Sequence, residues 1–179
     1  MTTRLATRRK AREWALQLLV QFDLNPPLDV EAGIAAFWDQ QAELEMDALD
    51  DDTQRLRPLF TSQNADIQVS LAEMRGFAED RIRGVWAARE ALDAQIEPYL
   101  KNWSIYRLGT VERNTLRLGV WEITNCHDIP TAIIVNEAID LAKFFSETKS
   151  GRFVNGVLDN FAKAARAPKS ETFVPSAQA

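Results

Sequence analysis

The sequence predicts an all-α protein, a compact bundle of about seven helices. Apolar residues recur three and four positions apart over long stretches, which is the period of one face of a helix. Prolines or short polar breaks separate these stretches. We find no strand-hairpin pattern and no internal repeat. The pattern therefore indicates amphipathic helices that pack around a shared core.

Two helices are expected in the first forty residues. The first follows a disordered arm at residues 1–6 and takes Thr7 as its N-cap, and Asn25-Pro26-Pro27 ends it. A second helix starts near Asp29 and fades into an acidic run. The apolar face of the first helix consists of Ala11, Trp14, Ala15, Leu18, Leu19 and Phe22.

The middle of the chain is expected to hold one long helix and one central helix. The long helix spans about residues 67–96, and Pro98 breaks it. A later helix, capped by Thr110, runs to about Asn125 and has apolar residues on opposite sides, so we expect it at the centre of the bundle. The link between the two helices is expected to be buried through Trp103, Ile105 and Leu108.

Two further amphipathic helices are expected between residues 128 and 163. Pro130 suits a first helical turn, where its missing N–H costs nothing, and Asp128 is the expected N-cap. A polar break at residues 146–151 separates this helix from the last one. We therefore predict one domain over residues 1–166, followed by a disordered tail at 167–179.

Length and composition limit the kinds of protein that this sequence can form. The chain has 179 residues, of which 46% are hydrophobic, enough for one globular core. Its single cysteine, Cys126, excludes an intramolecular disulfide, and a reducing cytoplasm is the simple interpretation. No uninterrupted apolar run is long enough to span a membrane, and no secretory signal follows the basic N-terminus. We therefore predict a cytoplasmic protein without a membrane partner.

Charge is segregated along the chain. Residues 39–52 hold seven acids and no Lys or Arg, and setting them aside leaves 21 bases against 19 of the 26 acids, a net charge of +2 instead of −5. The first twelve residues hold five bases and no acid. Segregation of this kind says more about charged partners than the total charge does.

The basic start is the strongest functional feature. Arg8, Arg9, Lys10 and Arg12 form a cluster at a helix N-terminus, where the macrodipole already favours anions. This unfavourable placement is explained if the cluster has an anionic partner, and Lys and Arg neutralise the phosphates of RNA. The alternative is a solvated basic end that aids solubility.

Other charged positions extend the candidate surface. Arg113 and Arg117 lie one turn apart, and Lys149 and Arg152 lie at the start of the last helix. For these four residues the sequence favours a solvated face, and a binding surface is the alternative. Glu112 lies early in its helix, where a carboxylate interacts favourably with the helix dipole, and we expect it to be exposed.

No catalytic or metal chemistry is predicted. Cys126-His127-Asp128 contains the only cysteine and the only histidine, so no zinc cluster can be built from them. Side chains of adjacent residues point apart and rarely form a catalytic dyad. The sequence contains no Gly-rich strand–turn–helix motif for a methyl-donor cofactor. We therefore predict a protein that is not an enzyme and carries no cofactor.

Three segments carry a family resemblance. They are RRKAREWALQLLVQFD at Arg8–Asp23, NWSIYRLGTVERNTLRLGVWEI at Asn102–Ile123, and IVNEAIDLAKFFS followed by GRFVNGVLD. Together, and in this order, they resemble the NusB family of bacterial transcription antitermination factors. The chain looks longer than the family pattern at residues 40–64, where we expect a variable acidic insertion, part helix and part loop.

The resemblance implies an all-helical factor that binds boxA RNA of nascent ribosomal RNA together with the ribosomal protein NusE. The pair then joins the antitermination complex on RNA polymerase. At Val20 the family often has an aromatic residue, and valine cannot stack on a base. The family allows homodimers, and no residue here decides that state. The RNA-binding residues are then expected to be Arg8, Arg9, Lys10, Arg12, Arg117, Lys149 and Arg152, and the partner-binding residues Glu112, Arg113 and Asp128.

Two alternatives stay open. The same helical module occurs as an RNA-binding domain of ribosomal RNA cytosine methyltransferases, although the missing cofactor motif argues against an enzyme. The second alternative is a helical protein-interaction module without RNA. Its N-terminal bases would contact an acidic protein or the chain's own acidic segment. A salt-dependent RNA titration separates the RNA and non-RNA interpretations.

Overall fold

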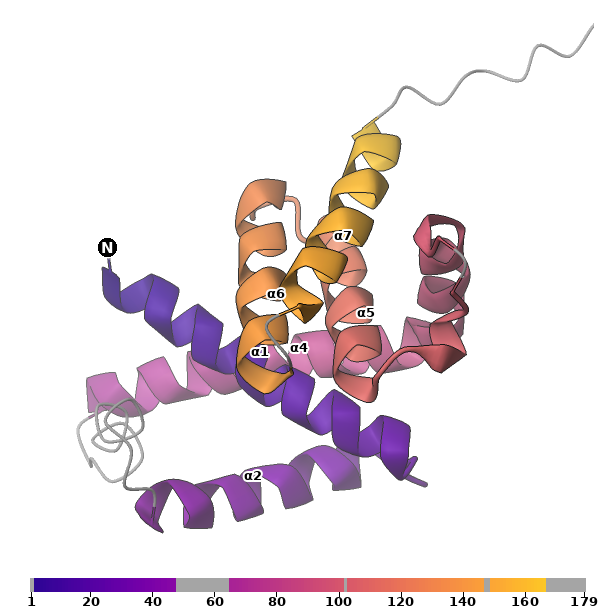
Figure 1. Cartoon of the computed structure of the whole chain (residues 1–179). Coiled ribbons are helices and arrows are strands. Elements are labelled where there is room, and N and C mark those ends of the chain that lie inside the picture. Colours follow the sequence, from indigo (N-terminus) through magenta and orange to yellow (C-terminus); the bar gives the residue numbers. More distant parts are fainter. Residues whose placement is uncertain (1, 48–64, 102, 147–148, 167–179) are drawn as a thin grey trace, which may run out of the picture.

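A computed structural model describes residues 2–47, 65–101, 103–146 and 149–166, and these ranges contain helices and no strand (Figure 1). The all-α prediction is confirmed, with six α-helices in the described residues against about seven expected. They are α1 (Thr2–Leu24), α2 (Val30–Asp47), α4 (Ala65–Ile96), α5 (Thr110–Asn125), α6 (Thr131–Phe145) and α7 (Ser150–Arg166). Two short 3-10 helices, η1 (Glu97–Tyr99) and η2 (Ile105–Arg107), connect α4 to α5.

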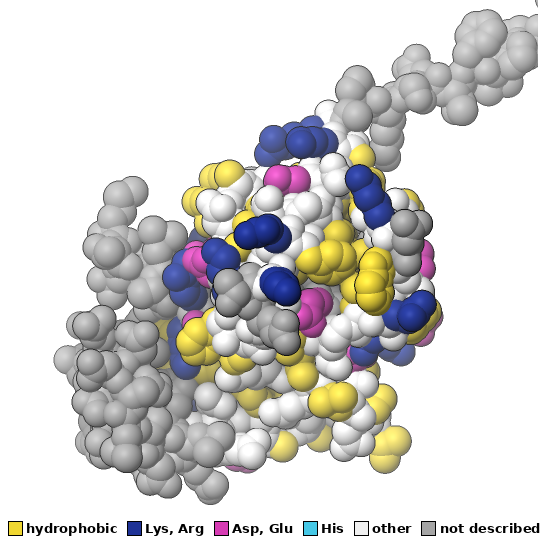
Figure 2. Space-filling model, in the orientation of Figure 1, with side chains coloured by type: hydrophobic (Ala, Val, Ile, Leu, Met, Phe, Trp, Pro, Cys, Tyr) yellow, Lys and Arg dark blue, Asp and Glu magenta, His cyan; other side chains and the backbone are white. Residues whose placement is uncertain are grey.

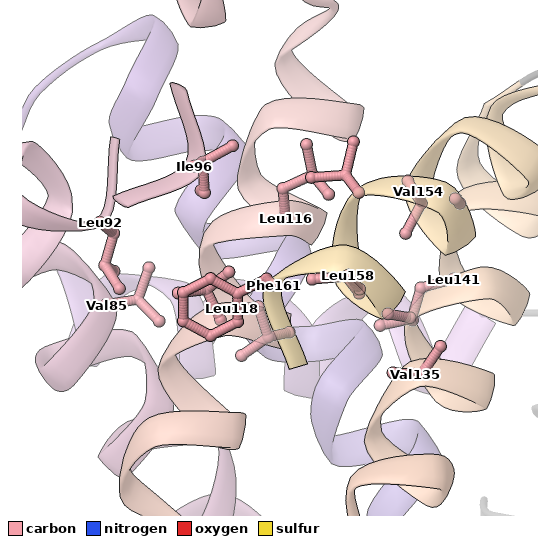
Figure 3. Close-up of a cluster of buried hydrophobic side chains, with 14 of the residues drawn as sticks. Val85, Leu92, Ile96, Leu116, Leu118, Val135, Leu141, Val154, Leu158 and Phe161 are labelled. Atoms are coloured by element: carbon pink, nitrogen blue, oxygen red, sulfur yellow. The ribbon is translucent and has the colours of Figure 1, made fainter. Parts of the chain in front are cut away.

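Helix α5 is the centre of the fold. It packs against α1, α4, α6 and α7, and every residue from 114 to 120 is buried. Its Leu116 and Leu118 share one apolar cluster with Leu92 of α4 and Leu158 of α7 (Figure 3). The expectation of a central helix is confirmed, because a helix that is apolar on opposite sides must be covered on both.

A second apolar cluster joins α1 and α4 to α2. Trp14 of α1 is fully buried there and meets Trp38 of α2 edge-on, with ring centroids 5.3 Å apart. Helix α1 contributes to both clusters, since Leu16 and Leu19 face the α5 side. It crosses the molecule from the N-terminal side toward the start of α5 (Figure 1).

Two glycines let neighbouring helices approach closely. A Cβ atom at Gly84 of α4 would lie 2.3 Å from the ring of Trp121 in α5. A Cβ atom at Gly119 of α5 would lie 2.8 Å from a methyl carbon of Leu158 in α7. Both distances are far below van der Waals contact, so side chains at these positions would push the packed helices apart.

Several expected boundaries are confirmed. Helix α4 matches the long helix, and Pro98 lies in η1 directly after it. Helix α2 begins beside Asp29, whose Oδ1 accepts a backbone N–H two residues further on at 2.9 Å. Acidic residues of the expected insertion continue α2 as far as Asp47. The rest of that insertion, residues 48–64, and the expected tail at 167–179 lie outside the described residues.

The expected start of the first helix is wrong. Helix α1 begins at Thr2, so residues 2–6 are helical and Thr7 lies within the helix instead of capping it. This part of the chain consists largely of Arg, Lys, Leu and Ala, which are among the best helix formers. The small cost of basic residues near a helix N-terminus does not outweigh that propensity.

Two expected N-caps are also wrong. Gly109, and not Thr110, holds the N-cap position of α5. Pro130, and not Asp128, holds the N-cap position of α6. Neither position has a side-chain capping hydrogen bond. The N-cap expected from side-chain chemistry therefore lies one residue too late for α5 and two residues too early for α6.

The link before α5 is only partly buried. Ile105 is 2% exposed, and its backbone N–H donates to Oε2 of Glu97 at 3.0 Å. Leu108 is half-buried and packs on the core. Trp103, however, is 53% exposed, so the expectation that it is buried is wrong. The apolar character of a residue does not say which side of a short turn it occupies.

We predict that Trp14→Ala lowers the free energy of unfolding by about 3–5 kcal/mol, because it leaves a large cavity between α1 and α2. Urea unfolding followed by circular dichroism measures the change. The control is Leu28→Ala, at a fully exposed position, which should stay within about 0.5 kcal/mol of the parent. Equal effects of the two variants would show that Trp14 does not hold these helices together.

Candidate nucleic-acid and partner interface

The predicted basic cluster on α1 divides between the surface and the core. The side chain of Arg9 is 47% exposed, whereas that of Arg12 is only 3% exposed. Arg8 and Lys10 are half-buried. Arg12 shares the inward side of α1 with Ala15 and other buried residues three and four positions on, and helical geometry therefore turns it away from solvent.

Arg12 takes part in a buried ion-pair triad. Its Nε donates to both carboxylate oxygens of Glu122 at 2.9 and 3.1 Å, and Nε of Arg81 donates to Oε1 of Glu122 at 2.7 Å. Glu122 is 1% exposed. The triad ties α1 and α4 to α5. Arg12 is thus a core ion pair, and the exposed basic surface does not include it.

Arg117 and Arg113 belong to a second ion-pair network. Arg117 donates to Asp93 at 2.6 and 2.7 Å and to Asp23 at 3.1 Å, and Nε of Arg113 also donates to Asp23, at 2.8 Å. Burial alone would lower the pKa of Arg117, but the two carboxylates raise it above the ordinary value. The expectation of a solvated face is wrong for both arginines, because they fasten the end of α1 to α4 and α5.

Glu112 is half-buried and contacts Ser146 at the end of α6 and Ser150 at the start of α7. Its Oε1 accepts hydrogen bonds from Oγ of Ser146 at 2.5 Å and Oγ of Ser150 at 2.6 Å. Gly109 makes room for the carboxylate, since a Cβ atom there would lie 2.2 Å from Oε2 of Glu112. Burial raises the pKa of Glu112, but the two serine hydrogen bonds outweigh burial and hold the pKa below its ordinary value. The expectation of an exposed Glu112 is therefore wrong.

The remaining predicted residues are exposed. Lys149 and Arg152 lie at the start of α7, and Asp128 lies in the loop between α5 and α6. Glu112 and Asp128 are at opposite ends of α5, a helix of 16 residues. Such a helix is about 24 Å long, so the structure does not bring the two predicted partner residues into one patch.

The structure has a hollow between α1 and α6 that the sequence does not predict. It has a volume of about 410 Å³. Arg9 lies in it and donates to Glu137 at 2.9 Å and to Asp140 at 2.8 Å. Lys143 and Phe144 also line it, and Phe144 is 73% exposed. Both residues fall outside the apolar stripe of α6, and this spacing could have identified them as surface residues.

Charge on the visible face is dispersed. Figure 2 shows Lys and Arg side chains separated by hydrophobic and acidic ones, without one continuous basic patch. The α1 cations are interrupted by acids as well, because Arg9 is paired with two carboxylates and Nζ of Lys10 lies 3.4 Å from Oε2 of Glu13. A polyanion that binds here must compete with carboxylates on the protein's own surface.

The Cys126-His127-Asp128 segment does not form a reactive site. Cys126 is buried and lies 3.4 Å from Nη2 of Arg81, and burial raises the pKa of its thiol. His127 and Asp128 are exposed. Across the described ranges, no group of three or more His, Cys, Asp or Glu residues could hold a metal ion. Within the same ranges no helix has the length and apolar character needed to span a membrane.

Comparisons with known proteins agree on one family. The sequence model of the NusB family matches residues 9–163. The transcription antitermination protein NusB of Listeria innocua is 36% identical over 155 residues, which are 87% of this chain and 95% of the relative. The NusB protein of Listeria monocytogenes matches with the same identity and coverage.

Solved structures give the same result. NusB of T. maritima aligns with a TM-score of 0.64 at 29% identity, over 87% of this chain and 90% of that one. A crystal structure of the antitermination factors NusB and NusE in complex with double-stranded RNA aligns with a TM-score of 0.62 at 28% identity. That alignment covers 88% of this chain and 97% of the solved chain.

The fold and these matches define a helical, non-enzymatic transcription antitermination factor. The chain belongs to the NusB family.

We predict that Glu112→Ala lowers the free energy of unfolding by about 1–3 kcal/mol, because the hydroxyls of Ser146 and Ser150 lose their acceptor. Urea unfolding at pH 7 measures the change. Asp128→Ala, at an exposed carboxylate on the other end of α5, is the matched control and should change stability by less than about 0.5 kcal/mol.

The difference in stability between the parent and Glu112→Ala should depend on pH. The pKa of Glu112 is lowered in the folded state, so its contribution is fully present above the unfolded pKa, at about 4.3, and is lost as pH falls through the folded pKa. The stability difference between parent and Glu112→Ala should therefore shrink below about pH 4. A difference that stays constant down to pH 3 would mean that the carboxylate charge is not what the serines stabilise.

Proposed function

We propose that this chain binds boxA-type RNA of nascent ribosomal RNA transcripts together with the ribosomal protein NusE. The pair then joins the antitermination complex on RNA polymerase, in the cytoplasm. The observation that carries the proposal is the match to the solved complex of NusB, NusE and double-stranded RNA over 88% of this chain. The exposed Arg9 on α1, and the exposed Lys149 and Arg152 at the start of α7, support it from the chain's own chemistry.

The proposed RNA surface runs from α1 to the start of α7. Arg8, Arg9 and Lys10 supply the α1 end. Lys143 lines the same hollow as Arg9, and its side chain lies against Gly151, next to the exposed Arg152. These contacts connect the two groups of cations across α6. Phosphate contacts along this path would position the RNA without reading its sequence.

Two of the seven predicted RNA residues take another role in this proposal. Arg12 orients α1 against α5 through Glu122, and Arg117 does so through Asp23, so they shape the surface without touching RNA. For the partner protein we propose the exposed loop at Asp128 as one contact. Glu112 and Arg113 would support the partner surface indirectly. Glu112 holds Ser146 and Ser150, and Arg113 holds Asp23 at the end of α1.

Removing the basic end of α1 should weaken RNA binding. For the triple variant Arg8→Ala, Arg9→Ala and Lys10→Ala, affinity for a boxA-type single strand should fall, and the slope of log affinity against log salt should become shallower by up to about 2, at about 0.7 per lost contact. A fluorescence-polarisation titration at several salt concentrations measures both.

The matched control for the triple variant is Arg83→Ala on the α2 side of α4. Its side chain is 42% exposed and pairs with Glu31 and Glu79, much as Arg9 pairs with Glu137 and Asp140. It should leave RNA affinity unchanged. Thermal unfolding of the triple variant is measured in parallel, because Glu137 would keep only the Arg12 guanidinium, 3.9 Å away. A folded triple variant with the parent's affinity and salt slope would exclude this end of α1 as an RNA site.

Asp140→Asn should strengthen RNA binding. Asp140 accepts a hydrogen bond from Arg9 at 2.8 Å, and its charge competes with phosphate for that guanidinium. An exposed pair of this kind contributes about 0.2–1 kcal/mol, so affinity should rise by about 1.5- to 5-fold at low salt. Glu90→Gln on α4 removes a more exposed carboxylate that pairs with Arg89, and it should have no such effect. A fall in affinity for Asp140→Asn would mean that Asp140 positions Arg9 for RNA.

A further inference from the structure

Two large aromatic side chains stand on the surface just before α5. Tyr106 is 76% exposed and Trp103 is 53% exposed. By contrast, Trp14 is completely buried and Trp38 is 8% exposed. Most of the surface of Trp103 and Tyr106 is therefore not used by the core. Exposed aromatic rings of this size are characteristic of binding surfaces.

The two rings are held on a fixed turn. Ile105, which lies between them in the chain, is 2% exposed and anchors the segment in the core. The backbone N–H of Ile105 donates to Glu97 at 3.0 Å, and that of Arg107 donates to the carbonyl of Ser104 at 3.0 Å. Tyr106 follows Trp103 by three positions, so their Cα atoms are at most about 11 Å apart. These contacts hold the backbone that carries the rings, which reduces the ordering that ligand binding would require.

Cations flank the two aromatic residues. Lys101 and Arg107 are exposed, and the Arg107 guanidinium lies over the Trp103 ring, 5.6 Å from its centroid. Residues 98–111 contain no Asp or Glu, although the chain as a whole has a net charge of −5. The surface thus combines π-faces with positive charge. The carboxylate that reaches it, Glu97, accepts the backbone N–H of Ile105.

We propose that Trp103 and Tyr106 form a stacking platform for unpaired bases of single-stranded RNA, with Lys101 and Arg107 placed to contact the adjoining phosphates. The inference rests on the proposed function and adds a base-contacting site to it. Every base presents a π-face to an aromatic ring, and alternation of aromatic and basic residues suits single-stranded nucleic acid. The core of a protein–protein interface is instead depleted of charged residues.

The platform continues the proposed RNA surface. The turn that carries Tyr106 leads directly to Gly109, against which the Glu112 carboxylate lies. Glu112 in turn binds Ser146 and Ser150 at the start of α7, where Lys149 and Arg152 are exposed. The platform also supplies aromatic contacts that Val20 cannot make, since Val20 is half-buried against the core.

The test compares two double variants in a titration with a boxA-type single strand. Trp103→Ala with Tyr106→Ala should lose about 5- to 140-fold in affinity for each lost base stack. Its salt slope should stay close to the parent's, because Lys101 and Arg107 remain. Trp103→Phe with Tyr106→Phe keeps two rings and should bind within a few-fold of the parent. Leu24→Ala with Leu28→Ala removes two exposed apolar side chains elsewhere and should have no effect.

A second measurement follows the ring itself. Trp103 is the most exposed tryptophan of the chain, so stacking of a base should quench part of the intrinsic fluorescence. Trp103→Phe alone should remove that quenching while largely preserving RNA affinity. The same strand annealed to its complement should show neither quenching nor sensitivity to the alanine variants, since its bases are already stacked and paired.

The outcomes separate the platform from the proposed function. If the parent binds RNA with a salt slope that depends on Arg8, Arg9 and Lys10, but the alanine double variant binds equally well, the platform is overturned and the proposed function stands. If the alanine variant loses NusE binding with unchanged RNA affinity, the surface is a protein interface and the platform is likewise overturned. A parent that binds neither single-stranded nor duplex RNA overturns both.

Discussion

The buried carboxylate of Glu122, held between the guanidiniums of Arg12 and Arg81, is the interaction on which the arrangement of α1, α4 and α5 depends. Removing these charges from water costs several kcal/mol per ion, and only good geometry offsets that cost. A different rotation of α1 would take the Arg12 guanidinium away from Glu122 and leave that buried carboxylate with Arg81 alone. The triad therefore fixes the rotation of α1 about its axis, and this rotation decides which of its basic residues reach the surface.

Core and surface thus use the same residue type for different purposes. Arg12 and Arg117 stabilise the contact of α1 with α5, while Arg9 remains exposed and pairs with Glu137 and Asp140. The exposed positive charge that remains is modest and interrupted. Phosphate contacts on such a surface would supply limited affinity. The proposed RNA binding would therefore also depend on the partner protein and on exposed rings such as Tyr106.

Glu112 connects the region proposed for the partner with the region proposed for RNA. Its hydrogen bonds hold Ser146 and Ser150, and through them the start of α7 with the exposed Lys149 and Arg152. A substitution at this carboxylate therefore changes the position of two cations as well as the surface at the α5 start. Loss of partner or RNA binding in such a variant is interpretable only together with its stability, for which Asp128 provides the matched control.

Periodicity in the sequence determined the all-α class, the long helix α4, the central position of α5 and the apolar face of α1, because these depend on spacing within one segment. Only the tertiary structure decided which charged and aromatic side chains are buried and which are exposed. Arg12 is buried because Glu122, 110 residues away in sequence, neutralises it, and a pattern read along one helix contains no information about that partner. Trp103 is exposed because Ile105 occupies the inward side of its turn. Local spacing places a residue on a helix face, but only packing decides whether that face meets solvent, a carboxylate or another helix.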